Sequence, residues 1–295
     1  MYPKTARGPA VPAVLAFVTV LALLAAGCFG PAPAQPRLTL ATTTSVNDSG
    51  LLGFILPDFE ARNHAKTAVV AVGSGQALEI GRRGDADVLI VHSPAAEQAF
   101  LANGSGTVRW QIMYNYFAIV GPALDPAGVR NATNATDAFA RIAANHSVFV
   151  SRGDASGTNA KELQIWSALS LNTSTFPASW YKSIGQGMAQ ALHAAFELGG
   201  YTLTDEGTYW SQTDIGPNAS GGSGLHLLLG GLAHPTVDLK NTYSVIQLNA
   251  TRVPTINATL ALAFALWVTS PETAALIGNY SVNGHQLFFP DPRRT

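Results

Sequence analysis

The sequence predicts an α/β fold built on a largely parallel sheet. From Arg37 onward, short runs that are apolar along their whole length alternate with stretches of helical pattern. Strands that are apolar on both faces are typical of parallel sheets covered by helices. The chain of 295 residues is 47% apolar and 12% charged, which excludes a disordered chain and suits one large domain or two ordinary ones.

The elements follow in order from these patterns. Strands are expected at Leu38–Ala41, Ala68–Val72, Val88–Val91, Phe117–Val120 and Val148–Val150. Helices are expected between and after them, at Pro57–Asn63, Gln76–Arg83, Ala95–Leu101, Ala138–Ala144, Asn159–Leu169 and Met188–Leu198. Pro57 is expected in the first turn of its helix, where proline is tolerated.

The apolar run Ile256–Val268 predicts a core helix rather than a membrane span. Its 13 residues include Asn257 and Thr259 and fall short of the roughly 20 needed to cross a bilayer. A further helix should follow, capped by Ser270 with Pro271 in its first turn.

Charge and cysteine content exclude several classes of protein. The formal net charge is −1 without a basic block, so no nucleic-acid partner is expected. A single cysteine, Cys28, allows neither a disulfide framework nor a thiolate metal site within the chain. The seven histidines are scattered, so neither a metal cation site nor a cofactor is expected.

The N-terminus has the pattern of an export signal. Lys4 and Arg7 precede the apolar run Val11–Ala26, which ends in Leu24-Ala25-Ala26-Gly27-Cys28. Small residues before a cysteine resemble the lipobox of prokaryotic lipoproteins, which predicts a signal peptide over 1–28, lipidation of Cys28 and a linker over 29–36. An uncleaved anchor helix is the alternative. Either way, the rest of the chain is expected outside the cytoplasmic membrane.

Sequons for N-glycosylation point the same way. The motif N-x-[ST] occurs ten times, whereas the 15 Asn and 44 Ser and Thr of the chain predict about two by chance. This excess predicts an exported glycoprotein, and together with a lipobox it suits an archaeal surface protein. The alternative is an Asn- and Thr-rich surface that carries no sugar.

Loops after the predicted strands share one chemistry. Four of them are rich in hydroxyls and glycines and precede helix N-termini: Thr42–Ser45, Gly73–Gly75, His92–Pro94 and Ser151–Thr158. Ligands of open α/β sheets bind at the carboxyl ends of strands, and helix N-termini favour anions. Only the last loop holds a cation, Arg152, whose guanidinium can bind an oxyanion through a forked contact. Simple helix capping is the alternative for each loop taken alone.

Enzyme motifs are absent from the sequence. Gly73-Ser74-Gly75 is neither a nucleophile elbow nor a P-loop, and the adjacent acids Asp205 and Glu206 are expected to face solvent. Two readings from other classes stay open. One is a secreted hydrolase with Ser151 or Ser74 as nucleophile and His92 as base, and the other is a structural surface glycoprotein without a small ligand.

The segment Ala41–Leu52, with its Thr42-Thr43-Thr44-Ser45 run, resembles the opening motif of TupA-type tungstate-binding proteins. Further segments resemble the same family in the same order: Val72–Leu78, Gly84–Pro94, Ser151–Thr158 with Lys161–Leu163, Tyr181–Met188, Tyr201–Tyr209 and Gly284–Asp291. The resemblance implies a type II periplasmic-binding-protein fold with two α/β lobes, a hinge and an interlobe cleft. It places lobe 1 at 37–115 and 210–295 and lobe 2 at 116–209, with crossings near Tyr114–Phe117 and Thr208–Ser211.

The resemblance also implies the ligand, the partners and the site. The ligand would be tungstate, with molybdate, phosphate or sulfate as alternatives, delivered by a lipid-anchored monomer to an ABC permease with a separate ATPase. The implied ligand-binding residues are Thr43, Thr44, Ser45, Ser74 and Ser93 in lobe 1 and Ser151, Arg152, Thr158 and Gly187 in lobe 2. Asn47 is expected to be unmodified, because a sugar there would block the cleft. Without the signal peptide 15 basic residues face 18 acidic ones, so capture would depend on local donors.

Overall fold

A computed structural model describes residues 35–212, 214–216 and 224–294. The predicted signal peptide with Cys28, most of the linker and residues 217–223 lie outside this part of the chain. The strands are β1 (Arg37–Thr43), β2 (Lys66–Val72), β3 (Val88–Val91), β4 (Gly106–Pro122), β5 (Phe149–Ser151), β6 (Tyr181–Ser183), β7 (Tyr201–Asp205), β8 (Leu225–Gly230), β9 (Lys240–Leu248), β10 (Ser281–Val282), β11 (His285–Gln286) and β12 (Phe289–Arg294). The α-helices are α2 (Thr44–Asp48), α3 (Leu51–Asn63), α4 (Ser74–Arg83), α5 (Pro94–Ala102), α6 (Ala135–Ala144), α7 (Gly157–Ala168), α8 (Met188–Glu197), α9 (Glu206–Ser211), α10 (Ala258–Val268) and α11 (Pro271–Asn279).

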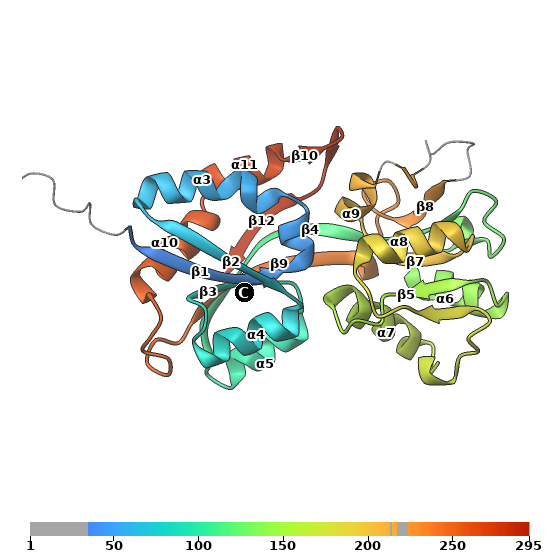
Figure 1. The fold of residues 1–295 in the computed structure, drawn as a ribbon, viewed down its shortest axis with the longest axis horizontal. Coiled ribbons are helices and arrows are strands. Elements are labelled where there is room, and N and C mark those ends of the chain that lie inside the picture. Colours follow the sequence, from blue (N-terminus) through green and yellow to red (C-terminus); the bar gives the residue numbers. More distant parts are fainter. Residues whose placement is uncertain (1–34, 213, 217–223, 295) are drawn as a thin grey trace, which may run out of the picture. The chain divides into compact units, whose positions relative to one another are not determined.

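The α/β fold is confirmed, with a mixed rather than a largely parallel sheet (Figure 1). Strands run in the order β2-β1-β3-β9-β4-β7-β5-β6, and β8 and β12 also pair with β4. The outer pairs are parallel, whereas the pairs that involve β4 and β9 are antiparallel. Only the end of β4 is predicted from the sequence. Its earlier part mixes Arg109, Gln111 and Asn115 with apolar residues, which breaks the continuous apolar run that marks the other strands.

Four hydrophobic cores define two lobes. In the first lobe, one core lies under α3 and α10 and holds Phe59 and Phe264, and a second lies under α4 and α5. Figure 1 shows these two helix pairs on opposite sides of β1. In the second lobe, one core holds Phe139 and Trp166 of α6 and α7, and the other holds Leu192 of α8. Each lobe therefore has a sheet buried on both faces, as fully apolar strands require.

The chain passes between the lobes along two adjoining strands. Met113 of β4 packs in the first lobe and Phe117 in the second, and the return runs from Leu239 to Tyr243 at the start of β9. The predicted return near Thr208–Ser211 stays a prediction that the cores do not favour, because α9 occupies that segment and its Tyr209 packs in the second lobe.

The predicted division of the chain at residue 210 stays a prediction. The cores favour a later boundary, because Ile215 and Leu225 pack against Tyr209 and Leu192 of the second lobe. Leu239 likewise packs in the second lobe, so these contacts favour an end of that lobe close to residue 239.

Pro57 lies inside α3 and not in its first turn, contrary to the sequence prediction. The helix begins at Leu51, after Gly50 in the left-handed conformation with φ of 81°. Leu52, Ile55 and Phe59 are buried on one side of the helix. Burial of this apolar face outweighs the loss of one backbone hydrogen bond at proline.

The two C-terminal helices agree with the prediction. Ser270 accepts a hydrogen bond from the Thr273 amide and Pro271 opens α11. Within residues 35–212, 214–216 and 224–294, no single helix has the length and apolar character of a membrane span. Helices α10 and α11 reach that length only together, and the chain bends by 63° between them.

Candidate anion site

A cavity of about 630 Å³ is lined by strand ends and helix N-termini of both lobes. The first lobe contributes Thr44, Ser45, Asp48, Ala71, Val72, Gly73 and Gln76. The second contributes Arg152, Asp154, Ala155, Ser156, Gly187, Met188, Ala189, Gln190, Asp205, Thr208, Ser211 and Gln212. The predicted residues Thr44, Ser45, Arg152 and Gly187 thus come together, at the strand ends where α/β proteins bind ligands.

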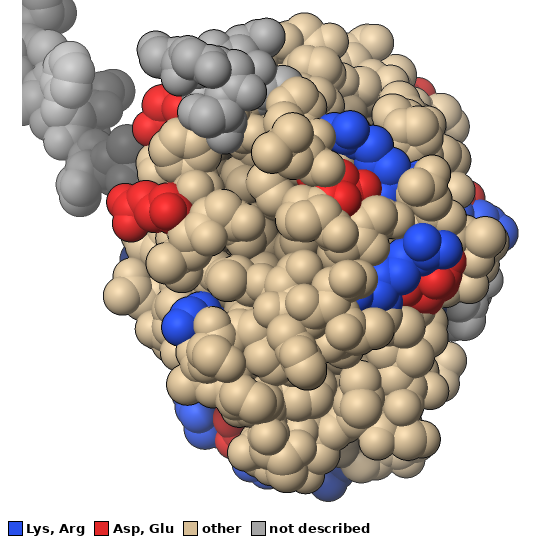
Figure 2. All heavy atoms as spheres, turned by 90° about the vertical axis from the view of Figure 1, so that its right-hand side faces the viewer, with Lys and Arg blue, Asp and Glu red and all other residues tan. Residues whose placement is uncertain are grey.

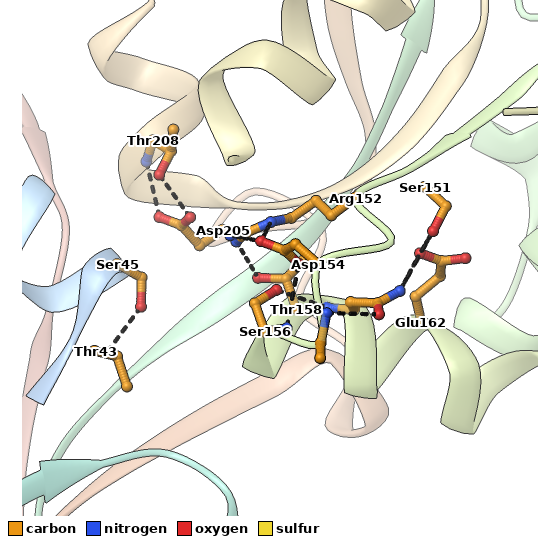
Figure 3. A network of polar contacts seen from close by, with 12 residues as sticks. Thr43, Ser45, Ser151, Arg152, Asp154, Ser156, Thr158, Glu162, Asp205 and Thr208 are labelled. Carbon is orange, nitrogen blue, oxygen red and sulfur yellow. Dashed lines mark hydrogen bonds and ion pairs between the residues drawn. The ribbon is translucent and has the colours of Figure 1, made fainter. Parts of the chain in front are cut away.

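On the first-lobe side, hydroxyls surround the start of α2 and α4. The Thr43 hydroxyl lies 3.0 Å from that of Ser45 and accepts from the Val46 amide (Figure 3). Ser74 follows Gly73, which caps α4 without a side-chain hydrogen bond. The Ser74 hydroxyl is buried and has no hydrogen-bond partner among the described residues. Buried polar groups are normally bonded, so this hydroxyl keeps a free donor, although Ser74 is not among the residues that line the cavity.

On the second-lobe side, Arg152 is the only Lys or Arg among the described residues that line the cavity, and its side chain is nearly buried. Its Nε and Nη2 donate to one oxygen of Asp154 at 3.1 and 2.5 Å, and its Nη1 donates to the Thr158 hydroxyl at 3.4 Å. The other Asp154 oxygen accepts from the Ser156 amide. Asp154 therefore holds the guanidinium in one orientation and leaves part of its donor set for a ligand.

Helix N-termini add neutral donors around the guanidinium. Gly73, Ser156 and Gly187 are the N-caps of α4, α7 and α8, and all three line the cavity. Gly73 and Gly187 provide no capping side chain. The first amides of a helix have no carbonyl partner within it, and the helix dipole favours negative charge at that end. The cavity is therefore suited to an anion with several acceptor oxygens.

Ser151, predicted as a ligand, does not line the cavity. Its hydroxyl donates to Oε2 of Glu162 at 2.6 Å, and Figure 3 shows it directed toward that carboxylate. Glu162 also accepts from Trp166 Nε1 at 3.1 Å and from the Tyr181 hydroxyl at 2.7 Å. Burial raises the pKa of Glu162, and these donors oppose the shift. Glu162 and its four donors, Ser151, Asn159, Trp166 and Tyr181, form an anchor beneath the Arg152 loop.

Ser93, also predicted as a ligand, lies at a different hollow of about 430 Å³. Its amide donates to Glu97, and Glu97 pairs with Arg109 at 2.6 Å. The loop before α5 is thus held by a buried ion pair, that of Glu97 with Arg109. The same loop lines the second hollow together with Phe117 and Lys240.

Comparison with known proteins agrees with this geometry. The family model of the PBP superfamily domain matches residues 30–272. A protein of Haloferax volcanii, assigned to an ABC transporter as its anion-binding component, is 46% identical over 258 residues, or 86% of this chain and 72% of that protein. Tungstate-binding protein TupA of Peptoclostridium acidaminophilum is 38% identical over 292 residues, or 94% of this chain and 97% of that protein.

The chain belongs to the TupA family. The solved structure of the tungstate-binding protein TupA from Desulfovibrio alaskensis G20 matches it with a TM-score of 0.75 and 41% identity, covering 87% of this chain and 99% of the other. The TupA-family chain therefore has the predicted periplasmic-binding-protein fold. The family consists of extracytoplasmic substrate-binding proteins for transport and not of enzymes.

The acid pair of this TupA-family chain contradicts the sequence prediction. Asp205 and Glu206 are both buried and do not face solvent. Asp205 caps α9 by accepting from the amide of Thr208 at 2.8 Å and from its hydroxyl at 2.6 Å, at the cavity wall. Burial raises the pKa of Asp205, while Thr208 and the charge of Arg152 oppose this. The sequence does hold a signal for this role, because Asp205 ends a short run rich in β-formers and stands three residues before Thr208, which is an N-cap pattern.

His92 links the site to the crossing strands of the TupA-family chain. Its Nδ1 donates to Oδ1 of Asn241 at 3.0 Å, because Nδ2 of Asn241 already donates to Asn115 and Tyr243. Nε2 then accepts, and it lies 3.4 Å from the Ser45 hydroxyl. Burial lowers the pKa of His92 from 6.5 to about 4, and the charge of Arg152 adds to the shift.

This shift predicts a pH dependence of stability. The unfolded chain protonates His92 near pH 6.5 and the folded chain only near pH 4, so stability due to His92 falls as the pH drops between these values. We expect wild type to lose up to about 3 kcal/mol more than His92→Gln over this window in urea unfolding. Replacement of the exposed His234 by Gln is the control and should leave the wild-type pH profile intact. Parallel profiles of wild type and His92→Gln would contradict the prediction.

Proposed function

We propose that this chain captures tungstate outside the cytoplasmic membrane and delivers it to the permease of an ABC importer. The observation that carries the proposal is the 38% identity to a tungstate-binding TupA over 97% of that relative. The cavity supports it with hydroxyls, helix amides and one oriented guanidinium. The sequence contains no P-loop, so a separate ATPase would supply the energy.

The donor set favours a fully deprotonated anion over phosphate. Phosphate retains a proton near neutral pH and would need a free acceptor in the site. Both oxygens of Asp154 and both oxygens of Asp205 already accept hydrogen bonds from the protein. Apart from Asp48, the other polar side chains that line the cavity are hydroxyls, carboxamides and one guanidinium, all of which can donate, and this suits tungstate or molybdate.

Calorimetric titration of the soluble form that begins after Cys28 tests the ligand. Tungstate, molybdate, sulfate and phosphate are titrated in separate runs into folded, anion-free protein. We expect tight binding of tungstate, weaker binding of molybdate and no heat from sulfate or phosphate. Binding of phosphate or sulfate alone would overturn the ligand, and silence with all four anions would overturn the receptor function.

The hydrolase alternative is not favoured. Ser151 donates its proton to Glu162, and the histidine proposed as its base instead lies next to Ser45. Burial keeps the pKa of His92 at about 4, which makes it a weak base. A receptor needs no turnover, and we propose that the chain has none.

Membrane attachment through a lipid on Cys28 is part of the same proposal. The sequence Leu24-Ala25-Ala26-Gly27-Cys28 supports it, and a lipid on the first mature residue would keep the receptor beside its permease. The intact mass of the membrane-extracted chain tests the lipid. Sedimentation of the soluble form tests our proposal that it acts as a monomer.

A further inference from the structure

Nine of the ten sequons lie in the described residues and differ in how the protein holds their asparagines. Attachment of a sugar needs an accessible Asn side-chain nitrogen and a Ser or Thr hydroxyl two residues later. Asn172 is one of seven that are exposed, and Asn249 is one of two that are half-buried.

Asn172 lies at the start of a short 3-10 turn, Thr173–Thr175, in the second lobe. Its side-chain oxygen accepts from the amide of Ser174 at 3.0 Å and from the Ser174 hydroxyl at 2.9 Å. The sequon is therefore already folded into a turn in which the Ser174 hydroxyl contacts the carboxamide of Asn172. No hydrogen bond of the side-chain nitrogen of Asn172 is recorded among the described residues.

The stretch of chain around Asn172 carries no charge of its own, and the flanking Lys161 and Lys182 donate to Gln164 and to the Ala178 carbonyl near its two ends. The 19 residues from Leu163 to Tyr181 contain no Asp, Glu, Lys or Arg, although Leu163 and Leu171 are 41% and 36% exposed. Soluble proteins usually carry charges on about a quarter or more of their surface residues. Figure 2 shows the end of the molecule that the second lobe forms, where charged side chains are few and separated by uncharged surface.

We propose that Asn172 carries an N-linked glycan and that Asn249 does not. In the reaction, Nδ2 of Asn172 bonds to the anomeric carbon of a lipid-phosphate-linked oligosaccharide. The bond from that carbon to the phosphate oxygen breaks, the phosphate leaves with the electron pair, and Nδ2 loses one proton. A sugar at this position supplies hydroxyls to the uncharged stretch. It also leaves the cavity open, because Asn172 lies beyond the C-terminal end of α7, whereas Ser156 at the opposite end of that helix lines the cavity.

Both the nitrogen and the oxygen of the Asn249 carboxamide form hydrogen bonds with the backbone. Its Nδ2 donates to the Gly104 carbonyl at 2.9 Å, and its oxygen accepts from the Thr251 amide at 3.0 Å. A glycan on this nitrogen would displace Gly104, which has φ of 79° in a tight turn. The same motif is therefore present at both positions, but only the turn at Asn172 presents its nitrogen to an enzyme.

Peptide mass mapping of the chain isolated from membranes of the cells that produce it tests the proposal. We expect the peptide with Asn172 to carry a sugar mass, which is lost in Asn172→Gln. Ser174→Ala should lose it too although Asn172 is retained, whereas Ser174→Thr should keep it. The peptide with Asn249 should have its unmodified mass, and Asn249→Gln should leave the glycan on Asn172 unchanged.

Two results would overturn the proposal. One is an unmodified Asn172 peptide in wild type, and the other is a sugar on Asn249. Tungstate affinity serves as a separate measurement, because Asn172→Gln should bind as wild type does. The glycan result is thus independent of the ligand proposed above.

Discussion

Replacement of Arg152 by Ala should weaken tungstate binding by about 1.5 to 3 kcal/mol, which is roughly a tenfold to 150-fold rise in Kd. The variant removes the only Lys or Arg among the described residues that line the cavity. Because Arg152 is only 6% exposed, water replaces its contacts poorly. Calorimetric titration with tungstate measures the change directly.

Two further variants separate charge from geometry at this position. Arg152→Lys keeps the charge but loses the forked donor set, so it should bind more weakly than wild type and better than Arg152→Ala. Arg141→Ala is the matched control, because Arg141 lies in the same lobe and pairs with Asp137 on the surface of α6. Unchanged affinity in Arg152→Ala would remove this residue from the site.

Replacement of Glu162 by Ala should lower the free energy of unfolding by more than about 3 kcal/mol, because four buried or half-buried donors lose their acceptor. Those donors are Ser151, Asn159, Trp166 and Tyr181. Urea unfolding at neutral pH measures the loss. Glu79→Ala is the control, since Glu79 pairs with Arg82 at the surface and its replacement should change the stability far less.

Glu162→Gln tests whether the anchor also serves binding. Its side chain keeps one carbonyl oxygen that accepts hydrogen bonds, so the variant should be more stable than Glu162→Ala. Its NH2 group, however, faces donors that it cannot accept from. Ser151 and Arg152 are neighbours, so movement of the former displaces the guanidinium, and tungstate affinity should fall as well. A variant as stable as wild type, with wild-type affinity, would show that the anchor is dispensable.

The local pattern of apolar and polar residues predicts the helices and strands of this fold better than it predicts which strands pair. Continuous apolar runs mark β1 and β3 correctly, since both are buried on two faces. The same criterion misses the first part of β4 and all of β9, because polar residues there bond to neighbouring strands and loops inside the protein. The antiparallel centre of the sheet depends on such tertiary contacts, which local pattern does not contain.

The candidate site shows the same limit at single residues. Strand-end reasoning finds the loops that reach the cavity but not the direction of each side chain. Ser151 and Arg152 are adjacent, and neighbouring side chains of an extended segment point to opposite faces. One therefore reaches Glu162 and the other the cavity. Asp205 is missed for a related reason, because its burial depends on tertiary contacts such as its pairing with Phe117 of β4.

The side-by-side crossings have a consequence for how this protein can be rebuilt. Tyr116 and Lys240 lie opposite each other in the register of β4 and β9, and such partners in an antiparallel pair are about 5 Å apart. The second lobe is thus a continuous insert whose two ends lie side by side in the sheet, and insertions with neighbouring ends are well tolerated. It could be excised and closed by a short turn, or exchanged for the same portion of a relative. Arg152 and Gly187 would be transferred together in such an exchange. The first lobe is made of two separate stretches of chain and cannot be exchanged as one segment.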